Sequence, residues 1–414
     1  MIQRIQYQEL WPQPKKMKFT VAQLGSRMHY AVPRIFRSAN CLERLFTDFY
    51  TREIATGPFK HSRLVKAIAS RRPKDIEPDF ITAFNSLGLE YAVRQRVAPK
   101  RRLNAYLWAG RSFCNRIVRH GLGSADAVYA FNSAAKELFT YARKTGIHTV
   151  LEQTIVPKRI EQQILLEESD RWPGWEHPEI PTAQSREFAE REEEEWAQSD
   201  IVICPSEFVS DGITKSRRPA RRCVIVPYGV DRSLPQKSDT RRDSSTLNVL
   251  FVGRLGLRKG LPYLLQAANL IDASQFKIRA AGTSDLLPNA LSVLGSRIEI
   301  LGPVPRSTLD QLYLWADVFV LPTLCEGSAT VTYEALAAGL PVITTPNCGS
   351  VVRDGIDGYI VPVRRPEIIA ERLGLLRSNP ELVREMSANA RERAQEYTLT
   401  RYSERLLAAI GLTN

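Results

Sequence analysis

The stretch that decides the fold runs from residue 317 to residue 346 and reads "DVFVLPTLCEGSATVTYEALAAGLPVITTP". "DVFVLPT" is typical of a short buried strand, "TVTYEALAAG" has the spacing of a helix that ends at a glycine, and "PVITTP" is a second strand. A strand, a helix and a strand in this order predict two parallel strands in one sheet. Two glutamates, Glu326 and Glu334, stand eight positions apart within this unit, where packing rarely needs a carboxylate.

The same alternation continues outward along the C-terminal half. "LNVLFVG", "FKIRAAG", "RIEILGPV" and "GYIVP" predict strands, and "KGLPYLLQAANLI", "RSTLDQLYLWA", "PEIIAERLGLLRS" and "PELVREMSANARERAQEY" predict helices. In the first half "DAVYAFN", "HTVLEQT", "DIVICPS" and "CVIVPYGV" predict strands of a second unit. The fold class is therefore α/β, with two Rossmann-like doubly wound domains facing a central cleft.

A chain of 414 residues suits two domains of about 200 residues each. The polar, turn-rich residues 231–248 are predicted to link them. We place the domains in residues 1–232 and 233–397, followed by a C-terminal segment in residues 398–414. Residues 51–105 are basic and weakly patterned, and no element is assigned to them.

Charge is distributed unevenly along the chain. Residues 1–150 hold 26 Lys+Arg against 10 Asp+Glu, whereas residues 151–200 hold 5 against 14. The basic third indicates either an anionic partner, such as a phospholipid surface, a lipid-linked pyrophosphate or a nucleic acid, or only a solvated surface. The acidic stretch "REFAEREEEEWAQSD" (residues 186–200) is predicted to be a solvated helix with Phe188, Ala189 and Trp196 on its inner face.

"RRLNAYLWAGRSFCNRIVRHGLG" (residues 101–123) predicts a basic amphipathic helix. Such a helix can lie on an anionic membrane or dock on the domain core, and we favour docking because its apolar residues are needed for a core. The chain shows no apolar run long enough to span a membrane, no signal-peptide segment and no CxxC pair among its six cysteines. These features predict a cytoplasmic protein without a metal site or disulfide framework.

A candidate phosphate-binding loop reads "VGRLGLRKG" (residues 252–260). Gly253 ends a strand, so backbone can approach a ligand closely, and Arg254 and Lys259 place positive charge beside a helix N-terminus. This combination suits a diphosphate, although it is neither a P-loop nor a dinucleotide fingerprint. Taken alone, the loop is better explained as a surface turn carrying two solvated cations.

The two glutamates fit the same site. Glu326 follows the carboxyl end of a parallel strand, where open α/β sheets bind ligands, and can accept hydrogen bonds from sugar hydroxyls. Glu334 lies about one turn into the next helix and can hold a diol such as a ribose. Singly, Glu326 can be an ordinary loop residue and Glu334 an acid that complements the helix dipole. Together with the Arg/Lys loop they favour a binding site.

Residues 200–400 resemble the nucleotide-sugar-dependent glycosyltransferases of family 4, which have the GT-B architecture. The resemblance rests on motifs in the family's order and spacing: "PSEF" (205–208), "VPYGVD" (226–231), "VGRLGLRKG", the two glutamates, "EALAAGLPVI" (334–343) and "DGIDGYIVP" (354–362). It implies that residues 1–232 form the acceptor-side domain and residues 233–397 bind the nucleotide sugar. The helix in residues 398–414 is expected to pack back on the first domain.

The resemblance also implies site residues. Arg254, Lys259 and Glu326 are expected to be catalytic, the first two by neutralising the donor diphosphate and Glu326 by contacting the transferred sugar. The remaining donor-binding residues are expected to be Gly253, Gly327, Ser328, Ala329, Glu334, Pro303 and Val304. Family members often have Phe-Gly where Ser328 and Ala329 stand, and a histidine near Glu152, so the pocket is expected to differ. On the acceptor side we expect Gly25, Arg27, His29 and Glu152.

The function expected from this resemblance is retaining, metal-independent transfer of a hexosyl or related sugar from a nucleoside-diphosphate sugar to a hydroxyl acceptor. The acceptor is expected to be a glycan or lipid-linked molecule in polysaccharide, lipopolysaccharide or glycolipid synthesis, at the inner face of the cytoplasmic membrane. The nucleoside-diphosphate sugar is a substrate, and no cofactor is expected. Alternatives are a hydrolase or epimerase on the same fold, a relative that only binds the donor, and a nucleic-acid-binding protein. The last lacks a recognisable nucleic-acid motif and leaves both glutamates unexplained, so no nucleic acid partner is expected.

Overall fold

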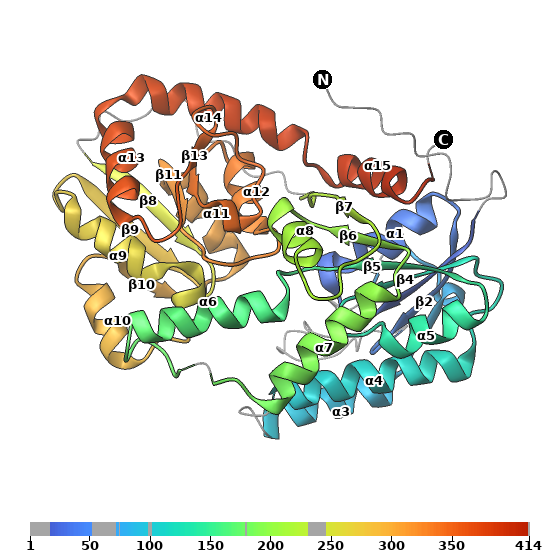
Figure 1. The fold of residues 1–414 in the computed structure, drawn as a ribbon. Coiled ribbons are helices and arrows are strands. Elements are labelled where there is room, and N and C mark those ends of the chain that lie inside the picture. Colours follow the sequence, from blue (N-terminus) through green and yellow to red (C-terminus); the bar gives the residue numbers. More distant parts are fainter. Residues whose placement is uncertain are drawn as a thin grey trace, which may run out of the picture.

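The computed structural model describes residues 17–51, 72–73, 75–97, 102–178, 180–230 and 246–412. Within these ranges the chain forms two sheets in which every paired strand is parallel (Figure 1). The first sheet has the order β3-β2-β1-β4-β5-β6-β7. Its strands are β1 Phe19–Gln23, β2 Leu42–Thr47, β3 Ile81–Ala83, β4 Ala127–Phe131, β5 His148–Glu152, β6 Ile201–Cys204 and β7 Cys223–Ile225.

The second sheet has the order β10-β9-β8-β11-β12-β13. Its strands are β8 Leu247–Val252, β9 Phe276–Ala281, β10 Glu299–Gly302, β11 Val318–Leu321, β12 Val342–Thr344 and β13 Gly358–Ile360. Both orders reverse direction beside their first strand, as in doubly wound domains. The predicted fold class is confirmed, and each strand named from the sequence forms where it was predicted.

Helices cover the sheets and bury the apolar faces of the strands. Those of the first half are α1 Ala31–Ser38, α3 Asn85–Val97, α4 Arg102–His120, α5 Lys136–Lys144, α6 Lys158–Arg171, α7 Ala183–Ala197 and α8 Glu207–Thr214. Those of the second half are α9 Leu261–Leu270, α10 Pro288–Gly295, α11 Arg306–Trp315, α12 Thr330–Ala337, α13 Pro366–Ser378, α14 Pro380–Gln395 and α15 Leu399–Ala409. In the part of the chain that the structure describes, no helix combines the length and apolar composition of a membrane span.

In the described part of the chain, α6 and α15 cross from one half of the molecule to the other. The α15 helix returns to the first domain, where Tyr402 contacts the ring of Tyr228 (Figure 1). The α6 helix reaches the second domain, where the Glu168 carboxylate accepts hydrogen bonds from the Tyr263 hydroxyl and the Arg364 guanidinium, both at 2.7 Å. The predicted boundary between residues 232 and 233 lies outside the described residues, as does most of the predicted linker.

The prediction of a solvated acidic helix is wrong in one respect. The α7 helix forms, and Phe188, Ala189 and Trp196 are buried as predicted. However, Glu192 and Glu195 are also buried. Their carboxylates accept backbone N–H groups at the starts of neighbouring segments, an arrangement that periodicity does not reveal.

Candidate active site

The two candidate loops of the second domain meet at the point where its strand order reverses. β8 pairs with β11, so the loop after Val252 and the loop after Leu321 leave neighbouring strands at the same edge. The Arg258 carbonyl joins them, because it accepts the Leu324 amide at 2.9 Å and the Thr323 hydroxyl at 3.0 Å. Gly260 has a φ of +69°, and a Cβ there would stand 1.9 Å from the Pro322 carbonyl oxygen. Only glycine permits this approach.

Lys259 and Glu326 lie in direct contact in this loop pair. Only 8% of Lys259 is exposed, and Arg258 stands 3.5 Å from the other Glu326 oxygen. Burial, followed by the Arg258 charge, lowers the pKa of Lys259 to about 8. Contact with the Glu326 carboxylate opposes this by favouring the ammonium form. The structure therefore brings together two of the three predicted catalytic residues and adds a second cation.

Arg254 and Glu334 have other partners. Arg254 pairs with Asp285, with 2.5 Å between Nη2 and Oδ1, and remains half exposed. Glu334 is buried on α12 and accepts hydrogen bonds from Arg306 Nη2 and the Tyr313 hydroxyl, both at 3.0 Å. In this arrangement Arg254 does not pair with Glu326, and the Glu334 carboxylate is held in one orientation by α11.

The loop before α12 lies at the contact between the domains. The Ser206 hydroxyl of the first domain donates to the Gly327 carbonyl at 2.6 Å, and a Cβ on Gly327 would stand 2.0 Å from the Thr154 carbonyl oxygen. The Ser328 hydroxyl donates to the Gly349 carbonyl at 2.8 Å. The predicted donor-binding backbone is thus held from both domains.

Sequence reasoning missed a row of charged side chains that reaches this loop from α6. Glu161 lies 3.0 Å from Lys158 on its own helix and 3.6 Å from Arg258 of the second domain. Positive and negative side chains therefore alternate from Lys158 to Lys259 through Glu161, Arg258 and Glu326. The only signal in the sequence was Arg258 beside Lys259, because nothing local shows that α6 crosses to the other domain.

A carboxylate from the segment after α6 also contacts the candidate phosphate-binding loop. Glu176 accepts the Leu257 backbone N–H at 2.5 Å, and its burial raises the pKa of the carboxyl. The Leu257 N–H of this loop is thus available to a carboxylate oxygen.

On the acceptor side, the turn after β1 has an unusual backbone. Gly25 has a φ of +83° and donates its N–H to Asp48 at 2.8 Å. Met28, His29 and Tyr30 follow with φ values of 46°, 50° and 60°. Successive left-handed residues other than glycine are strained, and such strain concentrates at functional sites.

Glu152 lies beneath this surface, with 1% of the residue exposed. Its carboxylate accepts hydrogen bonds from the Tyr129 hydroxyl at 2.7 Å and the Tyr228 hydroxyl at 3.1 Å. Burial raises the pKa of Glu152, while Arg27 opposes this rise. Arg27 and His29 are exposed. Among the predicted acceptor-side residues, Glu152 is therefore buried away from solvent.

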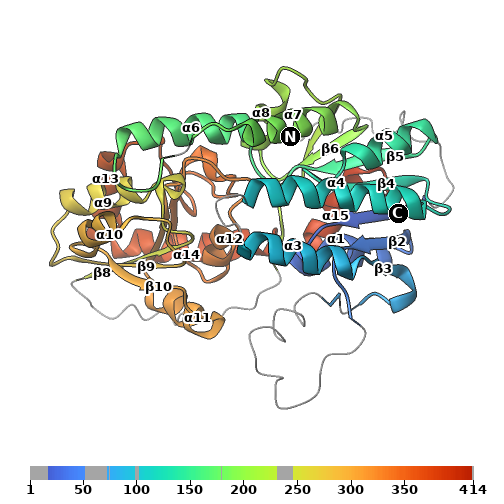
Figure 2. The ribbon, with the colours of Figure 1, turned by 90° about the horizontal axis from the view of Figure 1, so that it is seen from below.

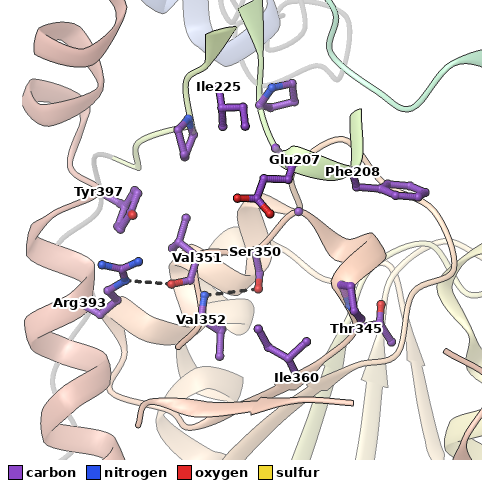
Figure 3. A pocket seen from close by; sticks show the side chains of 15 residues that line it. Glu207, Phe208, Ile225, Thr345, Ser350, Val351, Val352, Ile360, Arg393 and Tyr397 are labelled. Carbon is purple, nitrogen blue, oxygen red and sulfur yellow. Dashed lines mark hydrogen bonds between the residues drawn. The ribbon is translucent and has the colours of Figure 1, made fainter. Parts of the chain in front are cut away.

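Two cavities can be considered for the acceptor, one between the domains and one within the first domain. One of about 360 Å³ is lined by residues of both domains, including Glu207, Ser350, Arg393 and Tyr397 (Figure 3). None of the predicted site residues lines it. A second, of about 180 Å³, is lined by Leu103, Tyr106, Ile155, Val156, Lys158, Glu161, Phe188 and Glu192. Because Glu161 belongs both to this cavity and to the row of charged side chains, the second cavity is the better candidate for an acceptor site.

Two parallel-sheet domains whose C-terminal helix returns to the first domain form the GT-B fold. Solved structures with this arrangement include sucrose-phosphate synthase from Thermosynechococcus elongatus, with a TM-score of 0.63, 16% identity, and coverage of 95% of this chain and 98% of that chain. HepE from Anabaena, solved in complex with UDP and glucose, has a TM-score of 0.59, 15% identity, and coverage of 96% and 100%. At these identities the likeness shows the fold alone.

The family model covers the second domain. Residues 246–379 match the family model described as glycosyl transferases group 1. A D-inositol 3-phosphate glycosyltransferase of Actinosynnema mirum is 30% identical over 247 residues, which are 53% of this chain and 59% of that protein. An uncharacterized glycosyltransferase of Methanocaldococcus jannaschii is 32% identical over 155 residues, or 34% and 40%. The chain thus spans about half the length of the curated relatives it matches.

Proposed function

We propose that the protein is a retaining glycosyltransferase that moves a hexosyl or related sugar from a nucleoside diphosphate to a hydroxyl group, without a metal. The observation that carries the proposal is the contact of Lys259 and Arg258 with Glu326 at the strand-order reversal. These residues lie in the part of the chain that matches group 1 glycosyl transferases. Open α/β sheets bind ligands at such a reversal.

On the donor side, the ammonium of Lys259 and the guanidinium of Arg254 neutralise the diphosphate, with Gly253 allowing close approach. Glu326 contacts the sugar, Glu334 holds the ribose, and the backbone of residues 327–329 cradles sugar and phosphate. Pro303 and Val304 lie beside the base. To reach the diphosphate, Arg254 must break its ion pair with Asp285, which its half-exposed side chain allows.

In the reaction, the bond between the anomeric carbon and the diphosphate oxygen breaks while the acceptor hydroxyl attacks from the same face. The acceptor proton passes to the departing phosphate. Charge develops on the diphosphate, and each cation aimed at it contributes about 3 kcal/mol of transition-state stabilisation. Cleft closure excludes the water that would hydrolyse the donor.

On the acceptor side, we assign a glycan or lipid-linked hydroxyl to the cavity lined by Tyr106, Ile155 and Glu161. Gly25, Arg27 and His29 flank it in this proposal, and Glu152 acts from behind by its charge on Arg27. Synthesis of a cell-surface glycan at the cytoplasmic face of the membrane fits such an acceptor. Hydrolysis or epimerisation of the same donor is the alternative, and it predicts turnover that no acceptor accelerates.

The test is donor turnover by the full chain with a panel of uridine, guanosine and adenosine diphosphate sugars, read as released nucleoside diphosphate. UDP-glucose comes first, because HepE was solved with it. We expect release from one donor and a loss of about 10²–10³-fold in Lys259→Ala and in Glu326→Ala.

The control for these variants is Arg384→Ala, which removes an exposed ion pair with Glu381 on α14. It should match the wild type. An absence of both turnover and nucleotide binding for every donor, or equal turnover in Lys259→Ala, contradicts the proposal.

A further inference from the structure

The α3 helix exposes a row of aliphatic side chains, which we call the α3 stripe. It consists of Leu89, Val93 and Val97, which are 60%, 58% and 78% exposed. Positions four apart advance by about 40° around a helix, so the three form one band about 12 Å long. Among the described residues, no other helix exposes three large hydrophobic side chains.

The core does not use this stripe. α3 packs through its opposite face, where Leu87 and Gly88 are buried and a Cβ on Gly88 would stand 2.6 Å from the Asp48 carbonyl oxygen. The neighbouring α4, which the sequence singled out, instead buries Phe113, Cys114 and Ile117. The preferred prediction for α4, that it docks on the domain core, is therefore confirmed. The apolar surface that does not pack against the core belongs to α3.

The sequence that contains the stripe is strongly basic, although Arg111 pairs with Glu187 of α7. Residues 84–123 contain eight Lys+Arg and one acidic residue, Glu90. Glu90 is paired with Arg94, whose guanidinium also covers the Trp108 ring at 4.1 Å. Arg96 is exposed and lies about 20° around the helix from Leu89, on the same face as the stripe. Aliphatic side chains and positive charge thus share one surface.

We propose that the α3–α4 hairpin docks on an anionic phospholipid bilayer, with the α3 stripe in the interface and the surrounding cations at the headgroups. Charge complementarity selects an anionic surface, and the aliphatic side chains select lipid. A nucleic acid satisfies the cations but offers the stripe no apolar environment, because phosphate contacts dominate its binding.

The hairpin also lies beside the candidate active site. α3 and α4 run antiparallel, because Arg116 near the end of α4 donates to Ser86 at the start of α3 at 2.8 Å (Figure 2). The start of α4 supplies Leu103 and Tyr106 to the candidate acceptor cavity, so Val97 lies toward the cleft. Docking by this surface presents a membrane-embedded acceptor to the cavity, a consequence that rests on the proposed function.

The test is co-sedimentation of the full chain with vesicles of phosphatidylcholine alone or mixed equally with phosphatidylglycerol. Neither donor nor acceptor is used, so failure here is separate from failure of donor turnover. We expect binding to the anionic vesicles only, and a decrease of at least about tenfold in partitioning for Leu89→Ser/Val93→Ser/Val97→Ser. Arg96→Gln should bind several-fold more weakly, and about 0.5 M NaCl should weaken wild-type binding.

The matched control is Leu270→Ser/Val293→Ser/Ile356→Ser, which removes three exposed aliphatic side chains of the second domain and should bind as the wild type does. Circular dichroism confirms that each variant is folded. Equal binding to both vesicles, or an equal loss in both triple variants, overturns the proposal. Binding lost in Arg96→Gln but retained in the α3 triple variant, with tight binding to a short DNA duplex, overturns it in favour of nucleic acid.

Discussion

At the residue scale, the two glutamates that the sequence presents as a pair have separate environments. Glu326 contacts Lys259 and Arg258 in the loop between strands, whereas Glu334 is fixed by Arg306 and Tyr313 of α11. Among the described residues, the side chain of Glu326 pairs with Arg258 and Lys259, two cations that a diphosphate can also attract. Glu334 has both oxygens bonded within its own domain. In the proposed function, Glu326 is therefore the carboxylate whose partners are expected to change when an anionic donor binds.

The pKa of Lys259 gives a prediction for the pH dependence of donor turnover. Lysine carries its charge below its pKa, here about 8, and loses it above, so kcat/KM should fall as pH rises through 8. Between pH of about 7 and about 9.5 the charged fraction falls roughly 30-fold. A pH profile of kcat/KM checks this.

Lys259→Arg is the control for that profile, because a guanidinium stays charged throughout this range. The variant should be slower at neutral pH but flat across the interval. The same alkaline decline in both proteins would exclude Lys259 as its cause.

At the scale of elements, α7 organises the strand ends that face the cleft. Glu195 accepts the backbone N–H groups of Ser133, Ala135 and Lys136 at 2.6–3.1 Å, which caps the start of α5. Glu192 accepts the Lys158 N–H at 2.8 Å, which caps the start of α6. One buried acidic helix thus fixes the starts of two others, including the one that crosses to the second domain.

Burial raises the pKa of Glu192 to about 7, from an ordinary value near 4.5. The folded protein therefore holds a proton that the unfolded chain releases, and the free energy of unfolding should fall as pH rises from about 4.5 to about 7. Glu192→Gln removes this dependence, so its stability relative to the wild type should increase by about 3 kcal/mol across the interval. Urea unfolding at several pH values measures it.

Glu190→Gln, an exposed change on the same helix, should follow the wild type at every pH. Parallel stability curves for Glu192→Gln and the wild type would contradict the assignment of a buried, protonated Glu192.

At the scale of the whole molecule, the domains meet through backbone as well as side chains. Gly327 stands against Thr154, Ser206 binds the Gly327 carbonyl, and Glu167 and Glu168 of α6 bind Arg364. The candidate donor loop is therefore part of the interdomain contact, and its geometry depends on how closely the domains approach.

Gly327→Ala tests this dependence. The added Cβ would lie 2.0 Å from the Thr154 carbonyl oxygen, so the loop or the domains must separate. We expect a loss of at least about 10²-fold in kcat/KM and faster hydrogen exchange in residues 153–157.

The matched change is Gly374→Ala on α13, where a Cβ meets no atom within 4 Å. It should leave turnover unchanged and stabilise the helix by about 0.5–1 kcal/mol. Unaltered turnover and exchange in Gly327→Ala would show that the loop does not need the close contact.

Sequence alone determined the strands from β4 to β13, most of the described helices and the doubly wound class, because apolar runs and helical spacing are local patterns. It missed β1, β2 and β3. It also predicted that Lys259 and Glu326 share a site, since parallel strands place their carboxyl ends at one edge. Tertiary structure alone decided the burial of Glu192 and Glu195, the pairing of Arg254 with Asp285, and the approach of Glu161 to Arg258. These contacts join helix ends and an interdomain crossing that are far apart in sequence. A buried charge there loses its hydration, and only partners that folding brings together offset this loss.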